Sequence, residues 1–251
     1  MPNYAIKIKE LTKTYNNEDK EKRIILDKLN AKFETNTIHC LLGSSGCGKS
    51  TLMRIIGELE KYDSGEIIFD KEELKNGISM IFQENNLLPW YNVYKNIEIV
   101  LNSYYKKKLI KKTKKELKVE IDSQLEQYDL LKYSNYYPYE LSGGLKQKVA
   151  LVKTLITNPQ IVLFDESFSA LDYISKEMMH KLFLDDFYNK QYTAIVTTHD
   201  IREAIKLGDY IHILNNGGYT KIKNPLKESR TDGEDFDKFY QTIKEKYSKG
   251  G

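Results

Sequence analysis

The sequence predicts an α/β fold with a parallel-sheet core, an antiparallel β layer near the N-terminus and an inserted helical subdomain. Three observations predict it. A glycine-rich loop at 43–51 joins an apolar run to a helix-like segment, and apolar runs near 161–166 and 193–199 end in polar residues. A stretch from about 93 to 133 has no strand-like alternation. Apolar runs of this kind are typical of buried parallel strands, and helical insertions then form a separate layer.

Length and composition are those of a soluble globular protein. At 251 residues, with 40% hydrophobic and 30% charged residues, the chain is long enough to bury a sizeable core. No apolar run approaches the roughly 20 residues that span a bilayer, and the first residues have no signal-peptide core. We therefore expect the chain in the cytoplasm, meeting a membrane only through a partner. Cys40 and Cys47 are expected to form no disulfide, since so few cysteines are typical of a reducing compartment.

The lysines are unevenly distributed, although a net charge of +3 gives no argument for nucleic acid. Eight lysines lie within residues 106–118. Apolar residues at helical spacing in and after this run are Ile110, Leu117, Ile121 and Leu125. The spacing predicts an amphipathic helix with a solvated basic face. A basic patch against lipid headgroups or nucleic acid stays open as a second interpretation.

The N-terminal third predicts an antiparallel β layer. Alternating or apolar segments at 5–9, 11–15, 24–26 and 29–33 flank a charged turn at 16–23. Tyr15 lies at the end of such a segment. Its ring either stacks on a nucleotide base, as aromatic faces do, or is an ordinary strand-end tyrosine.

The glycine-rich loop matches the phosphate-binding pattern G-x-x-x-x-G-K-[ST] at every required position. Its residues are Gly43, Ser44, Ser45, Gly46, Cys47, Gly48, Lys49, Ser50 and Thr51. Glycines allow backbone N–H groups to turn toward phosphate oxygens at a helix N-terminus. We expect Lys49 to reach the β- and γ-phosphates and the Ser50 hydroxyl to ligate Mg²⁺. An ordinary glycine-rich turn would not explain the loop, lysine, hydroxyl and flanks together.

Three later segments carry polar residues that suit phosphate chemistry. Asp165 and Glu166 end an apolar strand, where Asp165 can hold Mg²⁺ through a water and Glu166 can polarise the attacking water. They could instead be an acidic pair that merely terminates a strand. His199 ends the strand at 193–198 and either hydrogen-bonds a γ-phosphate or caps the next helix. Residues 141–144 begin a helix, either as an anion-binding turn or as a flexible hinge.

The remaining segments complete the α/β pattern. Strands are expected at 66–70, at 78–82 before Gln83, and at 210–214. A hairpin turn is expected at 215–218 and one terminal helix after Pro225.

In this order, the segments resemble the nucleotide-binding subunit of ATP-binding cassette (ABC) transporters over nearly the whole chain. The family's signature motif is matched by Leu141, Ser142, Gly143, Gly144 and Gln147. The resemblance implies a P-loop NTPase core and roles for four residues outside the loop. They are Tyr15 stacked on adenine, Gln83 sensing Mg²⁺ and the membrane partner, Asp172 of the D-loop and the switch histidine, His199.

The resemblance also implies one ABC ATPase domain over 1–251. The catalytic core with its β layer would occupy about 1–84 and 160–225, the helical subdomain 85–159 and a tail helix 226–251. The chain departs from the family where Ser167 replaces the usual proline, and where Lys146 and Lys148 replace arginines. Lysine keeps the charge but loses the planar fork of arginine, and we expect neither departure to abolish activity.

Cofactors and partners follow from the same resemblance. ATP and Mg²⁺ are implied, as is a homodimer in which each nucleotide lies between one copy's phosphate loop and the other copy's residues 142–144. Two transmembrane permease subunits and an extracytoplasmic solute-binding protein are implied, and nucleic acid is not. The chain would then lie at the cytoplasmic face of the membrane.

The segment at 83–90, Q-E-N-N-L-L-P-W, is similar to cassettes of nitrate, sulfonate and taurine importers and of importers for thiamine precursors. That Pro89 and Trp90 simply pack a subdomain junction stays open. An exporter cassette stays open too, as does a soluble cassette ATPase acting on nucleic acid or ribosomes, although that class usually has a coiled-coil insert or a second cassette. A phosphate-loop kinase would leave residues 141–144 unexplained.

Overall fold

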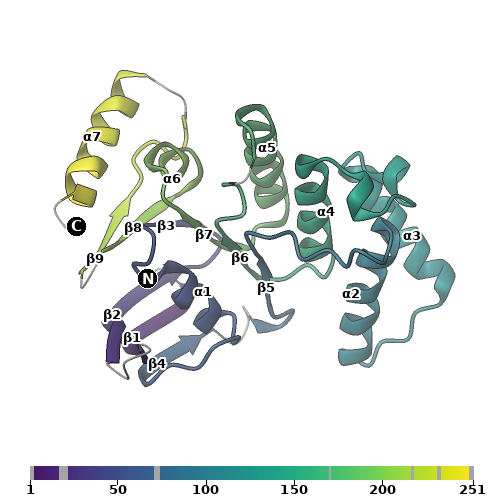
Figure 1. Ribbon diagram of the computed structural model, residues 1–251, viewed down its shortest axis with the longest axis horizontal. Helices are drawn as coiled ribbons and strands as arrows, with labels where there is room; N and C mark the ends of the chain where they lie inside the picture. The colour runs from purple at the N-terminus through teal and green to yellow at the C-terminus, as the bar shows by residue number, and fades with distance from the viewer. Residues whose placement is uncertain are drawn as a thin grey trace. The chain divides into compact units, whose positions relative to one another are not determined.

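The computed structural model describes residues 3–16, 22–70, 74–169, 171–215, 218–230 and 233–248. The chain forms two units (Figure 1). The first, here called the core unit, contains Met1–Met80, Gln160–Glu166 and Asp186–Gly251, and the second, the helical unit, contains Ile81–Pro159 and Ser167–Asp185. The expected turns at 16–23 and 215–218 fall largely on residues 17–21 and 216–217, which lie outside the described residues.

The core unit carries the predicted antiparallel layer as a three-stranded sheet in the order β2-β1-β4. These strands are β1 (Tyr4–Asn16), β2 (Lys22–Glu34) and β4 (Ser64–Phe69). The short strands expected within 5–15 and 24–33 are therefore parts of two strands of 13 residues each. Irregular register between Ile8 and Thr14 of β1 interrupts the alternation of apolar residues, because a bulge adds one residue to one strand.

The second sheet has the strand order β5-β6-β7-β3-β8-β9 (Figure 1). Its strands are β3 (Ile38–Leu42), β5 (Ile78–Ile81), β6 (Ile161–Asp165), β7 (Thr193–Thr198), β8 (Tyr210–Asn215) and β9 (Gly218–Lys223). The run from β6 through β7 and β3 to β8 is parallel, and β9 is antiparallel to β8. The parallel direction brings the carboxyl ends of β3, β6 and β7 to one edge, which is where open α/β sheets bind ligands.

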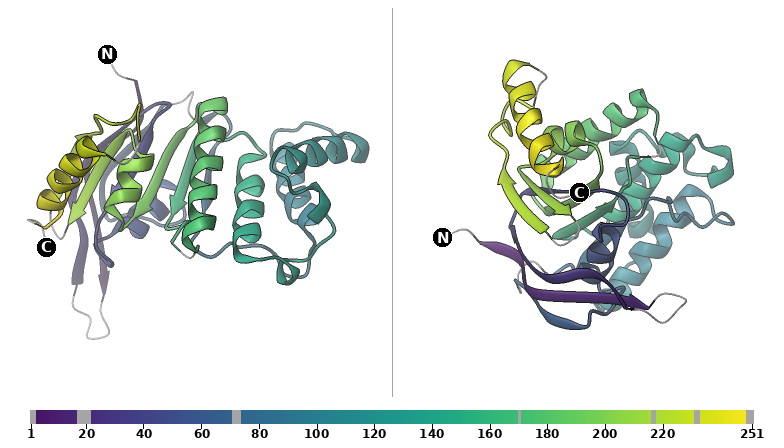
Figure 2. Two further views of the ribbon diagram at one scale, coloured as in Figure 1. Left: turned by 90° about the horizontal axis from the view of Figure 1, so that it is seen from above. Right: turned by 60° about the vertical axis from the view of Figure 1, so that its left-hand side comes forward.

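Helices of the core unit include α1 (Lys49–Ile56), α6 (Ile201–Leu207) and α7 (Glu234–Ser248). The expected terminal helix is α7, and Figure 2 shows it alongside α6. Phe236 and Ile243 are its buried residues, seven positions apart and so on one face of the helix. This face packs on α6 and β8.

The helical unit contains α2 (Val93–Lys107), α3 (Lys114–Gln127), two short 3₁₀ segments (Leu131–Tyr133 and Pro138–Glu140) and α4 (Gly143–Leu155). The helix α5 (Tyr173–Lys190) begins in this unit. Among the residues that the structure describes, no helix has the length and apolar character needed to cross a bilayer.

The predicted single amphipathic helix across the lysine run is wrong. The helix α2 ends at Lys107, and α3 begins at Lys114 with a capping box between Thr113 and Glu116. Leu117, Ile121 and Leu125 are buried as expected, but Ile110 lies in the connection and is exposed. The apolar spacing therefore continues by coincidence across a helix boundary. Thr113, with Glu116 three residues later, marks that boundary in the sequence.

Two histidines lie fully buried in adjacent strands of the core unit. Nδ1 of His39 is 2.9 Å from Nε2 of His212, and Nδ1 of His212 is 2.5 Å from the Tyr219 hydroxyl. Nε2 of His39 is 3.1 Å from the Glu34 carbonyl oxygen. One set of neutral tautomers satisfies this chain, with donation from Tyr219 to His212 to His39 to the carbonyl. Burial lowers the pKa of His39 to about 3 and that of His212 well below its usual value.

The histidine pair predicts loss of stability on mild acidification. Because the folded-state pKa values lie below the unfolded value of about 6.5, stability is present above that pH and falls as pH decreases through it. Two such groups lower the free energy of unfolding by about 2–3 kcal/mol per pH unit below pH 6. Urea unfolding at pH 7.5 and 5.5 measures this slope. Replacing His212 by glutamine should reduce the slope, and a flat profile in the unaltered protein would refute the assignment.

Candidate functional site

The phosphate loop follows β3 and leads into α1. Gly46 and Gly48 have φ angles of 77° and 104°, a region that side chains disfavour. A Cβ at Gly43 would lie 2.5 Å from the Leu214 carbonyl oxygen, so this position also excludes a side chain. Gly48 is the N-cap of α1 and makes no side-chain cap. The N-cap residue itself therefore leaves the first N–H groups of α1 without a side-chain cap, which suits an anion site.

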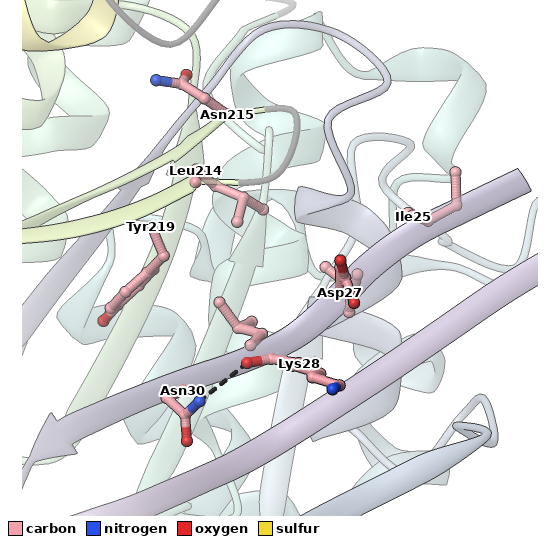
Figure 3. A pocket seen from close by; sticks show the side chains of 10 residues that line it. Ile25, Asp27, Lys28, Asn30, Leu214, Asn215 and Tyr219 are labelled. Carbon is pink, nitrogen blue, oxygen red and sulfur yellow. Dashed lines mark hydrogen bonds between the residues drawn. The ribbon is translucent and has the colours of Figure 1, made fainter.

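A pocket in the core unit is lined by residues of β2, β8 and β9 (Figure 3). Its lining includes Ile25, Leu26 and Leu214, and these three residues also pack against the positions of Gly48 and Gly43. At about 220 Å³ it is smaller than the roughly 300–1,000 Å³ of small-molecule sites. The phosphate loop, and not this pocket, is the candidate site.

Lys49 turns back into the loop and is 4% exposed. Its Nζ donates to the carbonyl oxygens of Gly43 at 2.9 Å and Ser44 at 3.0 Å. The same nitrogen lies 3.4 Å from Oε1 of Glu166. The loop thus holds a buried ammonium group beside a carboxylate, at the end of the loop where a phosphate chain would bind.

Ser50 and Asp165 lie together beside the loop. Oδ1 of Asp165 accepts hydrogen bonds of 3.0 Å from the Ser50 hydroxyl and 3.0 Å from the Thr197 hydroxyl. A hydroxyl and a carboxylate are ligands that Mg²⁺ uses, with phosphate oxygens and waters completing its shell. No group of three or more His, Cys, Asp and Glu side chains suits a metal in the described part of the chain. The pair therefore fits a metal that arrives with a phosphate ligand.

Glu166 has a strained backbone. Its φ of 46° is in the left-handed region, which costs about 1–2 kcal/mol for a residue with a side chain. Its N–H donates to the Thr197 hydroxyl at 2.8 Å, which helps to hold this conformation. Strain of this kind gathers at functional sites, and here it occurs where the carboxylate meets Lys49.

Thr197 is the residue of this group that the sequence motifs missed. It pairs with Asp165 in the register of β6 and β7, and its hydroxyl serves both acidic residues. The signal for it was positional, because aligning the first residues of the two apolar runs, 161 and 193, would have set residue 197 beside residue 165.

Tyr15 lies beside α1 and is 38% exposed. Its hydroxyl donates to the Glu60 carboxylate and lies 3.4 Å from the Thr51 hydroxyl. Nζ of Lys13 lies 4.9 Å from the centre of its ring. Burial raises the pKa of Tyr15. The structure therefore brings Tyr15 to the first turn of α1, while its stacking on a base stays a prediction.

His199 follows β7 and is exposed at the same sheet edge. The interpretation that it caps the next helix is wrong. Asp200 is the N-cap of α6, and its Oδ1 accepts from the N–H groups of Arg202 at 2.8 Å and Glu203 at 3.3 Å. The Asp200 carboxylate accepts from two N–H donors at once and suits the positive end of the helix dipole. The His199 imidazole therefore takes no part in the cap.

The signature residues lie in the helical unit at the start of α4. Ser142 is the N-cap, and its hydroxyl accepts from the Leu145 N–H at 3.3 Å. Ser142 and Gly143 are exposed, whereas Leu141 and Gln147 are buried. The buried residues anchor the turn, and the exposed ones present the N-terminus of a helix of 13 residues.

Gln83, Asp172 and Ser167 also belong to the helical unit. Gln83 is exposed just after β5. Asp172 accepts from the Ser175 hydroxyl at 2.6 Å and its N–H at 3.0 Å, and these bonds hold the pKa of its carboxyl below the usual value. The buried Ser167 hydroxyl has no hydrogen-bond partner among the described residues. The core unit thus brings Lys49, Ser50, Asp165 and Glu166 together and also contains Tyr15 and His199. The helical unit contains Gln83, the signature residues and Asp172.

Comparisons with known proteins give one consistent family. The ABC transporter family model matches residues 26–169. An aliphatic sulfonates import ATP-binding protein, SsuB, from Bacillus cereus is 36% identical over 237 residues, which cover 90% of each chain. A nitrate import ATP-binding protein, NrtD, from a Synechocystis species is 36% identical over 196 residues, 77% of this chain and 71% of the relative.

Solved structures agree with this result. A dimeric post-hydrolysis state of the ATP-binding cassette MJ0796, bound to ADP and Pi, has a TM-score of 0.75 and 31% identity. The match covers 87% of this chain and 98% of that structure. With the phosphate loop, the paired Ser50 and Asp165, and the Lys49–Glu166 contact in place, the chain belongs to the ABC transporter family, as an ATP-binding subunit with ATPase activity.

Proposed function

We propose that this chain powers the import of a small solute, of the nitrate, sulfonate, taurine or thiamine-precursor type. It would work as a homodimer at the cytoplasmic face of the membrane, with two permease subunits and an extracytoplasmic solute-binding protein and without nucleic acid. Both units would be parts of one ABC ATPase domain. The Lys49–Glu166 contact beside the Ser50–Asp165 pair carries the hydrolytic part of the proposal.

Hydrolysis follows from the charges at the loop. Lys49, already held by two carbonyl oxygens, exchanges its contact with Glu166 for β- and γ-phosphate oxygens. Glu166 is then released to accept a proton from the water that attacks the γ-phosphoryl group in line. Ser50 and Asp165 would hold Mg²⁺, with Gln83 as the further proposed ligand, and the ion would supply positive charge for the phosphates. The exposed His199 hydrogen-bonds the same γ-phosphate from the end of β7, and Tyr15 stacks on the adenine.

The site is completed by a second copy of the chain. Charge on the transferred γ-phosphoryl group needs donors on the side away from Lys49. The exposed start of α4, at Ser142 and Gly143, offers N–H groups and a helix dipole of the required sign. Asp172, in the D-loop, would help to position the phosphate loop of one copy against residues 142–144 of the other. The dimeric state of MJ0796 with ADP and Pi supports this arrangement.

The solute class rests on resemblance alone. The segment at 83–90 and the import proteins for sulfonates and nitrate among the relatives support an importer of that group. The ATP-binding subunit does not touch the solute in this mechanism, so its sequence carries no direct selectivity. An exporter cassette and a soluble ATPase acting on nucleic acid are the competing candidates.

Purification with partners tests the proposal. The tagged chain is recovered from detergent-solubilised membranes of its own cells, and the attached proteins are identified by mass spectrometry. We expect a hydrophobic permease in equimolar amount, retained equally by Lys49→Ala, because that change removes phosphate binding and not the docking surface. Recovery with ribosomes or nucleic acid in place of a permease would refute the proposal.

A further inference from the structure

A short connection joins the end of α2 to the start of α3 (Figure 1). It is rich in lysine and carries two exposed aliphatic side chains, Leu109 and Ile110. We call residues 106–118 the lysine tip. It has eight lysines and one glutamate, a formal charge of +7 in a chain whose net charge is +3, so all other residues together carry −4. Leu109 is 91% exposed, and Ile110 beside it is 46% exposed.

Most of the lysines in the tip are not neutralised. Lys118 pairs with Asp122 at 2.6 Å, and Lys112 lies 3.9 Å from Glu120. Five others form no ion pair with any residue that the structure describes, and they are Lys106, Lys107, Lys111, Lys114 and Lys115. All five are exposed. Their charges are therefore available to an anionic partner.

Leu109 has a backbone conformation that is unfavourable for leucine. Its φ is 58°, in the left-handed region just after the end of α2. Its N–H bonds to the Lys106 carbonyl, and the Ile110 N–H bonds to the Tyr105 carbonyl, which is the helix-ending pattern that favours glycine. The eleven residues other than glycine with positive φ in the described part of the chain are all polar except Leu109. The backbone of Leu109 is strained and its side chain is exposed, so this leucine does not stabilise the fold. Strain of this kind points to a functional role.

We propose that the lysine tip binds the surface of an anionic lipid bilayer. Lysines attract acidic headgroups, and Leu109 and Ile110 enter the boundary between headgroups and acyl chains. Single-stranded nucleic acid fits less well as the partner. Its unpaired bases stack on exposed aromatic rings, which the lysine tip would have to supply. The nearby Tyr104 and Tyr105 are half-buried and pack on each other, and the Tyr105 hydroxyl is held by Glu120. The contact would hold the helical unit at the membrane independently of any permease.

Vesicle sedimentation tests whether the positive charge of the lysine tip is needed for membrane binding. The full chain is mixed with vesicles of phosphatidylcholine alone or with about a third phosphatidylglycerol, a mixture chosen to give a strong negative surface potential. We expect binding only to the anionic vesicles, and loss of at least about tenfold in affinity on changing Lys106, Lys107, Lys111 and Lys115 to glutamine. The matched control changes four exposed lysines elsewhere, Lys181, Lys223, Lys244 and Lys246, to glutamine. It should bind as the unaltered chain does.

Leu109→Gly separates membrane insertion from folding. Glycine relieves the positive φ, so the melting temperature should stay equal or rise, whereas vesicle binding should weaken about threefold or more because a leucine side chain no longer enters the bilayer. Equal losses in the tip variant and the control variant would refute the proposal, as would unchanged vesicle binding in the tip variant. Binding of an oligonucleotide by the tip, without vesicle binding, would assign it to nucleic acid and also refute the proposal.

Discussion

Glu166→Gln is expected to lower ATP turnover by about 10²–10⁴-fold, the usual contribution of a general base. The amide has nearly the same shape as the carboxylate but cannot accept the proton of the attacking water. The backbone at position 166 should keep its conformation, because Thr197 holds its N–H and not its side chain. ATP affinity should be retained or rise, since Lys49 loses a competing carboxylate 3.4 Å away. Phosphate release and nucleotide titration measure the two effects.

The same variant should accumulate as an ATP-bound dimer. If closure requires ATP and opening requires its hydrolysis, a chain that binds but does not hydrolyse stays closed. Size-exclusion chromatography with ATP and Mg²⁺ should then show twice the monomer mass, and without ATP the monomer. Glu66→Gln, which alters an exposed carboxylate paired with Lys9, is the control and should keep full turnover. Turnover by Glu166→Gln at the unaltered rate would remove Glu166 from the role of base.

The core of the fold was predictable because its signals are local. Each parallel strand is buried on both faces, so β3, β6 and β7 appear in the sequence as continuous apolar runs. The phosphate loop has a fixed pattern, and the acidic pair directly follows an apolar run. Cys40 and Cys47 are free, as expected. The N-cap role of Ser142 was also predictable, because capping depends on a side chain and the N–H groups that follow it.

Other features depend on contacts that have no sequence period. The hydroxyl of Thr197 serves Asp165 only because β7 lies beside β6 in one register. His39 and His212 look like isolated polar residues within apolar strands, and they pair because β3 and β8 are neighbours. The break between α2 and α3 was missed because Ile110 continued an apolar spacing that the backbone does not follow.

Lys49→Ala is expected to weaken ATP binding by at least about a hundredfold, since hydrogen bonds to charged groups contribute roughly 1.5–3 kcal/mol each and Lys49 offers two or more to the phosphates. The loss should be larger for ATP than for adenosine, because the ammonium group meets only the phosphate chain. Titration with both ligands measures this difference. Lys9→Ala, which removes an equally charged but exposed side chain, should leave both affinities unchanged.

The result separates phosphate binding from loop folding. Lys49 also donates to two loop carbonyls and lies beside Glu166, so its removal leaves a partly buried carboxylate without its cation. This is expected to lower the melting temperature as well as the affinity. In the double variant Lys49→Ala, Glu166→Gln the carboxylate charge is absent as well, so the melting temperature should recover while ATP affinity stays low. Recovery of both would mean that Lys49 acts only by shaping the loop, and unchanged ATP affinity in Lys49→Ala would contradict its assignment to the phosphates.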